Sequence, residues 1–434
     1  MTGAPAGAGA AWTTILTSVA ASFTAPSHVL FVTLMCGWVM TPVRRTITHI
    51  ITTIDPRSRR PHDAYHRLVR DGIWDMVGLW CTLTTAMVDR LVPAGSVVLI
   101  DIDDTLFHKS GRNVDGAGLF RDAVRSGRNR TVHALGLNVV VATLRVRPPW
   151  PGTPIALPVA ARIRRKGDGP TTVELARAIL FDLAGWLPDR QIEVACDGAY
   201  STLCADRPDR VHVTSRIRRD AATYELTPPR TGRRGRPRKK GERLPSLAAM
   251  ADTATFTTGQ VDLRGVTATR LVWSRTLLWY GVTGDTPVLL VVVRDPDGVQ
   301  PDDFFVTTNI AACPAWVAGH YAGRWSIEVT FRDTKQALGG HQPQSWKRQG
   351  PQRTVALSLW LHAAVWLWYL HVWADRPSWT PTPWYPRKTS PSFVDALAAL
   401  RTVLWTQRIS PTQPAQALTA DIRDQLVAVL ARAD

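Results

Sequence analysis

The chain has 434 residues, enough for two or three domains with a sizeable core. Its formal net charge is +17 and its pI is about 10.4, so the protein is cationic at cellular pH. This charge favours a polyanionic partner, above all nucleic acid, with an anionic membrane surface as the alternative. The five cysteines have no C-x-x-C spacing, which argues against a zinc site or a disulfide framework.

The first part of the chain has a helical pattern. Apolar residues recur at helical spacing through residues 62–92. We therefore expect residues 1–92 to form an α-helical N-terminal domain, which either recognises DNA ends or only packs against the rest of the chain. No basic segment precedes the first apolar stretch, so we expect no signal peptide.

Strand patterns begin after this helical region. Apolar runs of strand length alternate with one helical segment, in which Thr171 or Thr172 can cap the helix and Glu174 lies in the first turn. The order strand, strand, helix, strand predicts a mixed α/β core whose first part is residues 93–206. The strands are expected at residues 97–103, 137–146 and 191–197.

A basic segment and a second β-rich region follow, together residues 207–310. Residues 207–244 contain 13 Lys or Arg against four acids, and Gly and Pro at their centre predict a loop. Within it, "RRGRP" matches the core of an AT-hook, in which Arg234 and Arg236 would reach into a narrow minor groove. The alternative is a solvated basic loop that contacts the DNA backbone without sequence preference.

The next segment, residues 311–350, is predicted to be mainly one long helix. At 100° per residue its Tyr321, Arg324, Glu328 and Lys335 fall within an arc of about 60°. One carboxylate flanked by two cations and a phenol could hold a metal ion and grip phosphates. The alternative is a surface helix with ordinary i,i+4 ion pairs.

Residues 351–434 are expected to form an α-helical C-terminal region, interrupted by a Pro-rich linker at residues 375–392. Its apolar segment, residues 356–374, is nearly long enough to span a bilayer. Because this segment contains two histidines and a serine, we expect a buried core helix and no membrane partner.

Three aspartates at the end of the first predicted strand are candidates for chemistry. The string D-x-D-x-T-L resembles the first motif of haloacid dehalogenase-type phosphatases, with Asp101 as nucleophile and Asp103 as acid/base. That reading leaves the net charge and the face with Tyr321 and Glu328 unexplained. It is kept as an alternative.

The spacing Y-x2-R-x3-E-x6-K favours another family. It resembles the signature of one branch of bacterial insertion-sequence transposases, which are DDE enzymes with a ribonuclease H-like core. "IDDTLFHKSG" resembles the first block of that branch, and "VACDGAYS" resembles the second. The resemblance covers roughly residues 96–346. It implies a ribonuclease H-like mixed-sheet α/β core with a β-rich insertion, flanked by α-helical N- and C-terminal regions.

The resemblance also implies roles for individual residues. Asp104, which precedes a Thr as in the family, would be catalytic and bind metal together with Asp197 and Glu328. Carboxylates suit hard cations, so two Mg²⁺ ions are expected, with Mn²⁺ as a substitute. The residues expected to contact DNA are Tyr321, Arg324, Lys335, Arg234, Arg236 and Trp273. Trp273 would stack on a flipped base, and Trp279 is a second candidate for that role. The alternative for both tryptophans is packing in the core.

The implied reaction is cleavage of transposon ends followed by strand transfer into target DNA, with a hairpin end as one intermediate. The expected partners are double-stranded DNA, as terminal inverted repeats and target, and a second copy of the chain in the synaptic complex. The expected place is the bacterial cytoplasm at the nucleoid. A transposase-derived protein that binds DNA without cutting it is the non-enzymatic alternative.

The choice of the first carboxylate is a separate prediction. Along a strand, side chains alternate, so Asp101 and Asp103 lie on one face and Asp104 on the other. Only one of these faces can meet Asp197. The family pattern selects Asp104, next to Thr105, and leaves Asp103 as the competing choice.

Overall fold

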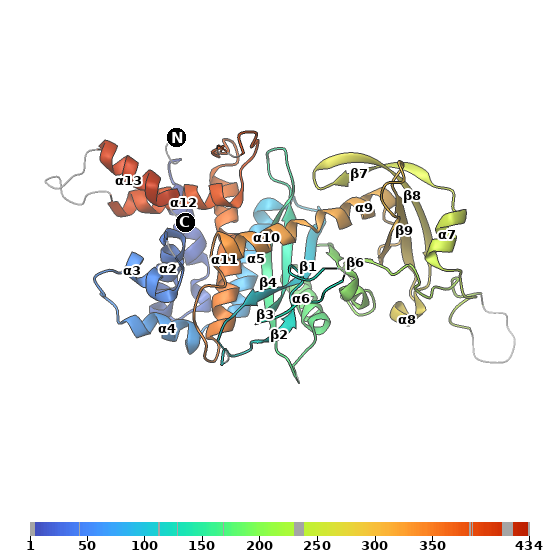
Figure 1. Ribbon diagram of the computed structural model, residues 1–434, viewed down its shortest axis with the longest axis horizontal. Helices are drawn as coiled ribbons and strands as arrows, with labels where there is room; N and C mark the ends of the chain where they lie inside the picture. Colours follow the sequence, from blue (N-terminus) through green and yellow to red (C-terminus); the bar gives the residue numbers. More distant parts are fainter. Residues whose placement is uncertain are drawn as a thin grey trace.

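The computed structural model in Figure 1 describes residues 5–432 except 43, 112, 128, 168, 230–237, 382, 384 and 410–419. A sheet lies at the centre of an elongated molecule. Helices from both ends of the chain lie on one side of it, and the β-rich insertion lies at the other end (Figure 1).

The central sheet has a ribonuclease H-like core, as the sequence predicts. The strand order within this core is β4-β3-β1-β5-β6. β1 pairs antiparallel with β3 and parallel with β5, and β5 pairs parallel with β6. β2 pairs with one end of β3. The bounds are β1 Val98–His108, β2 Gly118–Arg121, β3 His133–Val146, β4 Ile155–Arg164, β5 Ile192–Cys196 and β6 Val211–Arg216.

The β-rich insertion continues this sheet. Its strand β10 pairs antiparallel with β6, and β9, β8 and β7 follow in order toward the edge. The predicted AT-hook residues Arg234 and Arg236 lie outside the described residues. The bounds are α7 Leu247–Thr253, β7 Thr257–Leu263, β8 Val266–Leu277, α8 Tyr280–Thr283, β9 Val288–Arg294 and β10 Asp303–Thr307.

The described part of the N-terminal region is helical, as expected. Its buried side chains belong to the same hydrophobic cluster as the sheet and the C-terminal helices. Trp38, for example, donates its indole N–H to the carbonyl of Leu338, 2.8 Å away. The helices are α1 Ala8–Ser18, η1 Ala20–Ser22 (a 3₁₀ turn), α2 Ala25–Met40, α3 Ile47–Ile54, α4 His62–Arg70 and α5 Met76–Leu91.

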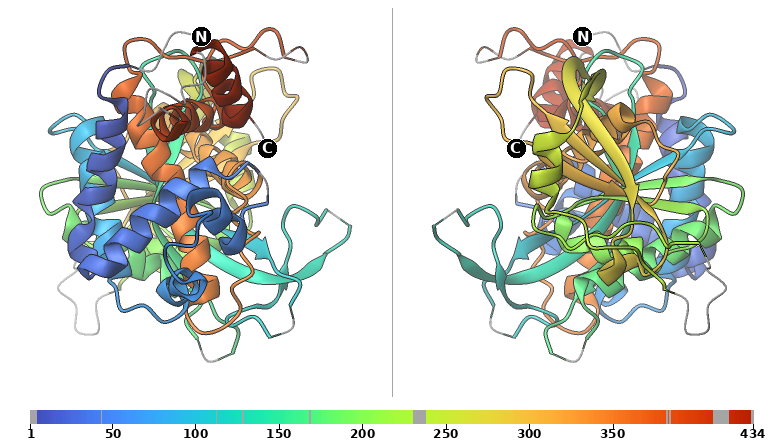
Figure 2. Two further views of the ribbon diagram at one scale, coloured as in Figure 1. Left: turned by 90° about the vertical axis from the view of Figure 1, so that its left-hand side faces the viewer. Right: turned by 90° about the vertical axis from the view of Figure 1, so that its right-hand side faces the viewer.

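The described part of the C-terminal region contains the helices α11 Gly350–Val372, α12 Phe393–Ile409 and α13 Ala420–Arg432. α11 is the one described helix long and apolar enough to cross a membrane, but 89% of its most apolar window is buried inside the protein. It contacts α1, α4, α5, α12 and β4, and Figure 2 shows it in orange among the blue N-terminal helices. Within the structure, α11 is therefore the central core helix.

The helix α6 (Thr172–Trp186) shows why local sequence predicts an element boundary well. Thr171 accepts a hydrogen bond from the Glu174 amide, and the Glu174 carboxylate accepts one from the Thr171 amide at 2.7 Å. This reciprocal capping box satisfies two amides that the helix itself leaves without partners. Of the two predicted caps, Thr171 is the one used.

Loss of this cap has a measurable cost. We expect Thr171→Ala to lower the free energy of unfolding by about 1 kcal/mol, because the orphaned helix amide loses its acceptor. Denaturant unfolding followed by circular dichroism checks this. Thr13→Ala is the control: Thr13 lies exposed inside α1 and bonds only to the Gly9 carbonyl, so its replacement should be neutral or slightly stabilising.

Candidate active site

Asp101, the first aspartate of β1, is fully buried. Its carboxylate pairs with the guanidinium of Arg145 on the neighbouring strand β3, with the Arg145 Nε 3.0 Å away, and Ser326 lies within 3.5 Å. An acid with 0% exposure that is already paired cannot attack a phosphate ester. The phosphatase alternative built on Asp101 and Asp103 therefore fails, because its nucleophile is inaccessible.

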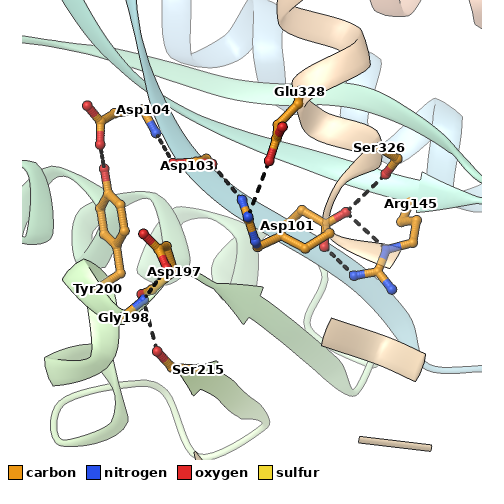
Figure 3. Close-up of polar contacts among 11 residues, drawn as sticks. Asp101, Asp103, Asp104, Arg145, Asp197, Gly198, Tyr200, Ser215, Ser326 and Glu328 are labelled. Carbon is orange, nitrogen blue, oxygen red and sulfur yellow. Dashed lines mark hydrogen bonds and ion pairs between the residues drawn. The ribbon is translucent and has the colours of Figure 1, made fainter. Parts of the chain in front are cut away.

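The next two aspartates diverge from one another. Asp103 points to the same face as Asp101 and accepts a hydrogen bond from Arg324 at 2.6 Å (Figure 3). Asp104 points to the opposite face, where the hydroxyl of Tyr200 donates to it at 2.7 Å. The predicted alternation along β1 is thus observed. It brings Asp103 to Arg324, whereas Asp104, the residue favoured by the sequence, lies on the other face.

Asp197 directly follows β5, and β5 lies next to β1 in the sheet. Its carboxylate is exposed and accepts a hydrogen bond from the Gly198 amide at 2.7 Å, which caps the 3₁₀ helix η2 (Gly198–Cys204). Because β1 and β5 are parallel, their carboxyl-terminal halves meet at one edge. A cavity of about 660 Å³ opens beside Asp197, with Arg216 and Trp279 among its lining residues.

The predicted long helix is broken into two pieces. α9 (Pro314–Gly323) ends before Arg324, and α10 (Ser326–Gln336) begins after Trp325. At the junction, amides bond three residues back instead of four, as from Arg324 to the Tyr321 carbonyl at 3.1 Å. The helix is thus tightened to a 3₁₀ turn, a feature that often marks a functional position. The junction puts Arg324 against the β1 carboxylates.

Arg324 links two carboxylates from different elements. Its guanidinium lies 2.6 Å from Asp103 on β1 and 3.4 Å from Glu328 on α10. The Asp103 side chain is 22% exposed and that of Glu328 is 48% exposed. Burial raises the pKa of Asp103 to about 6, against the opposing effect of Arg324 and with help from the charges of Asp104 and Asp197. Desolvation of the Asp103 carboxylate thus outweighs the stabilising effect of Arg324 on its charged form.

Two further predicted DNA contacts, Tyr321 and Lys335, lie on either side of Arg324 along the chain. The Tyr321 ring packs against Phe305 with ring centres 4.6 Å apart, and the Arg216 guanidinium lies 5.6 Å from the centre of the Tyr321 ring. Burial raises the Tyr321 pKa to about 12, so its hydroxyl stays protonated and can donate a hydrogen bond. Lys335 donates to Thr105 at 2.6 Å, and burial lowers its pKa to about 8.

The structure thus brings part of the predicted site together, with Asp103 in the place expected for Asp104. Arg324 contacts Asp103 and Glu328, and the charge of Asp197, from a third element, acts on Arg324. Tyr321 and Lys335 lie on the same α9–α10 segment as Arg324. Asp104 is set apart on the other face of β1. Within the residues that the structure describes, no group of three acidic, histidine or cysteine side chains is close enough to hold a metal ion. Arg324 lies between the carboxylates instead.

The predicted base-stacking residue lies elsewhere. Trp273, within β8, sits opposite Val292 and packs against the hydrophobic core. Trp279, which follows β8, lines the same cavity as Asp197. Both tryptophans are candidates from the sequence, which favours Trp273, but Trp279 is the one that lies beside Asp197, a candidate catalytic residue.

Comparison with known families identifies the superfamily of the chain. The family described as DDE superfamily endonuclease matches residues 19–280, more than half of the chain. The protein belongs to the DDE superfamily of endonucleases. The matched region of this DDE endonuclease contains Asp103, Asp104 and Asp197, and it ends before the α9–α10 segment. No curated protein matches the chain.

Membership of this superfamily supports a nuclease or transposase type of activity on DNA, and enzymes of the superfamily typically use divalent metal ions. In this DDE endonuclease, the carboxylates available for such ions are on β1, after β5 and on α10. The Y-R-E-K spacing itself is outside the family match.

Proposed function

We propose that this DDE endonuclease is an insertion-sequence transposase that cleaves transposon ends and transfers them into target DNA. The observation that carries the proposal is that Arg324 contacts two acids from separate elements, Asp103 on β1 and Glu328 on α10, while Asp197 directly follows β5, the strand next to β1. The order of these acids along the chain, Asp, Asp, Glu, and the net charge of +17 agree with a polyanionic substrate.

We further propose that Asp103 replaces Asp104 as the first carboxylate. Asp103 shares Arg324 with Glu328, and its pKa is raised in part by Asp197, so these three acids belong to one electrostatic site. Asp104 is instead bound by Tyr200, which stabilises the turn after β5. Asp104 then acts as a positioning residue: through its hydrogen bond with Tyr200 it holds η2, which begins directly after Asp197.

The side chains at the site fit a hard divalent cation. Their donors are carboxylate oxygens, which Mg²⁺ and Mn²⁺ prefer. Asp103, Asp197 and Glu328 would hold such ions. Bound there, two ions supply activation of the attacking oxygen and stabilisation of the leaving oxygen.

The basic residues of the site are assigned to the DNA backbone. Arg324 forms a fork that suits a phosphate as well as a carboxylate, so incoming DNA can exchange with Asp103 as its partner. Lys335 and the protonated hydroxyl of Tyr321 provide further donors on both sides. If cleavage passes through a hairpin end, Trp279 is the better candidate for stacking on a displaced base, because it borders the cavity beside Asp197.

The central experiment incubates purified protein with a labelled duplex carrying the inverted repeat that flanks the gene. We expect nicks at the repeat end with Mg²⁺ or Mn²⁺ and none with EDTA. Asp197→Asn should reduce cleavage roughly a thousandfold, the equivalent of about 4 kcal/mol of transition-state stabilisation, because a metal-binding carboxylate is lost.

The control variant is Asp206→Asn, since Asp206 is an exposed acid paired with Arg177 away from the site. It should cleave like the wild type. Salt-sensitive DNA binding without any nick would favour the non-enzymatic alternative, a transposase-derived DNA-binding protein. Wild-type protein that neither binds nor cuts this DNA would refute the proposed function.

Joining two transposon ends requires two active sites, so we propose a homodimer in the synaptic complex. Strand transfer is tested by adding a supercoiled target plasmid to pre-cleaved ends. Linear or relaxed products carrying the labelled end would support transfer. Cleavage without any joined product would restrict the activity to that of an endonuclease.

A further inference from the structure

A second basic surface lies beyond the active site, where the N-terminal helices meet the segment between α10 and α11. Two adjoining hollows of about 800 and 490 Å³ form one groove there. Both are lined by Arg44, Gln344, Ser345 and Trp346, which join them. The groove therefore runs from the end of β1 to the start of α3 and the face of α4.

The lining of this groove is cationic. Five Lys or Arg and four His side chains line it, and its described lining residues include no Asp or Glu. Trp346 is 50% exposed between the two hollows, with the Lys347 ammonium 4.5 Å from its ring centre. Cations interleaved with an exposed ring suit a nucleic-acid backbone. The basic lining residues are Arg44, Arg70, Lys109, Arg125 and Lys347, and the histidines are His49, His66, His108 and His341.

One wall of the groove is held rigidly by hydrogen bonds. The segment from Leu338 to Trp346 bonds through the Leu338 carbonyl to Trp38, and through the Gln342 side chain to the Arg45 amide at 2.7 Å. Lys109 donates to the carbonyls of His341 and Pro343 at 3.1 and 3.0 Å. These contacts tie the segment to both α2 and β1. The groove is thus preformed, which lowers the entropic cost of binding.

Some of the positive charge is already used. Asp122, which is nearly buried behind the groove, accepts a hydrogen bond from His108 at 2.7 Å and lies 3.5 Å from Arg125. Arg70 is paired with Asp71. In the part of the chain that the structure describes, Arg44 and Lys347 are exposed and have no acidic partner. These two cations are the ones free to meet a phosphate.

The groove is continuous with the active site along β1. One face of this strand carries Asp103, Thr105, Phe107 and Lys109. Lys335 lies between the active site and the groove, because its ammonium donates to Thr105 and lies 5.2 Å from the centre of the Phe107 ring. Six residues of strand from Asp103 to Lys109 span about 20 Å. Backbone phosphates on one strand are 3.4 Å apart along the axis, so this span corresponds to roughly six nucleotides.

We propose that this groove binds the backbone of duplex DNA, beginning roughly six base pairs from the phosphate that is cleaved. The inference rests on the proposed function, since it takes DNA as the substrate, and it adds a surface outside the active site. A duplex is favoured over a free anion because the cations follow a path across two hollows instead of converging on a single point. Contacts to phosphates give affinity and register without sequence preference.

The test compares a double variant with a charge-matched control. Arg44→Ala/Lys347→Ala removes the two free cations of the groove. Arg90→Ala/Arg376→Ala removes the same charge from two exposed arginines outside it, at the end of α5 and after α11. Affinity is measured by fluorescence anisotropy with a labelled 30-base-pair duplex carrying the inverted repeat, and by the slope of log K against log salt.

We expect the groove variant to bind at least about tenfold more weakly at 0.1 M salt, with a salt slope smaller by about two, one unit for each lost phosphate contact. The control should match the wild type in both. Circular dichroism of each protein confirms folding. With duplexes that extend 3, 8, 14 and 20 base pairs from the cleavage site, the wild type should gain affinity only beyond the shortest, and the groove variant should lose that gain.

Equal affinity and slope for the groove and control variants would overturn the groove assignment while leaving the active site intact. Absence of any DNA binding by the wild type would refute the proposed function itself. A groove variant that weakens binding equally for the shortest and longest duplexes would place the two cations at the cleaved end, and would also refute the inference.

Discussion

Asp103→Asn is expected to abolish metal-dependent DNA cleavage, with a loss of roughly a thousandfold or more. The substitution preserves size and one of the two acceptor oxygens, but it removes the negative charge that Asp103 contributes beside Arg324 and Asp197. The measurement is the single-turnover rate of nicking of a labelled inverted-repeat duplex with Mg²⁺. Because Asp103 is largely desolvated, its neutralisation should not lower the thermal midpoint, which distinguishes lost chemistry from lost folding.

Asp104→Asn is the matched control for this experiment. It changes the adjacent residue in the same way, on the face of β1 that meets Tyr200. We expect the cleavage rate to fall roughly tenfold to a hundredfold, the usual range when the lost group orients a metal-binding residue without binding the metal itself. If Asp104→Asn is inactive and Asp103→Asn cuts normally, the assignment made from the sequence was correct and the one made from the geometry was not.

The two aspartates show where sequence reasoning stops. Alternation along the strand correctly separates Asp101 and Asp103 from Asp104, because it depends only on backbone geometry. Which face becomes the active face depends on what packs there, and that is decided by the distant segment containing Arg324. The family motif favours Asp104 as the first carboxylate because a Thr follows it. The contact with Arg324, more than two hundred residues away in the sequence, favours Asp103.

The core fold was more predictable than the site. Continuous apolar runs of strand length and a capped helix specify the elements of the ribonuclease H-like sheet, and the helical regions at both ends were identified from periodicity. The break between α9 and α10 was missed. A pattern of period 3.6 passes through Arg324 and Trp325 unchanged, since the 3₁₀ turn alters the hydrogen bonds without altering the residue types.

One buried residue could have been found from sequence. Arg145 is a lone cation near the end of an otherwise apolar strand, and a buried arginine needs a carboxylate partner. Asp101 is the first acid in the apolar part of strand β1. It lies opposite Thr143, and Arg145 is two residues further along β3 on the same face. Matching the single cation of one apolar strand with the first acid of another would have predicted that Asp101 forms a buried ion pair with Arg145 and takes no part in the reaction.

Arg145→Met should therefore be the most destabilising of the substitutions considered, at about 3–5 kcal/mol, because it leaves Asp101 charged and unpaired in the core. Denaturant unfolding followed by tryptophan fluorescence measures the loss. Arg147→Met is the control, since Arg147 pairs with Asp262 at an exposed position, where an ion pair contributes less than about 1 kcal/mol.

The double variant Asp101→Leu/Arg145→Met separates the two causes of instability. If the unpaired charge dominates, removing both partners should recover much of the loss, because an apolar pair of similar volume often replaces a buried ion pair at little cost. If packing dominates, the double variant should be no more stable than Arg145→Met. Arg145 also lies 3.4 Å from His320 on α9, so the pair secures the junction that carries Arg324. Recovery of stability without recovery of DNA cleavage would then show that the Asp101–Arg145 pair positions Arg324 for the reaction.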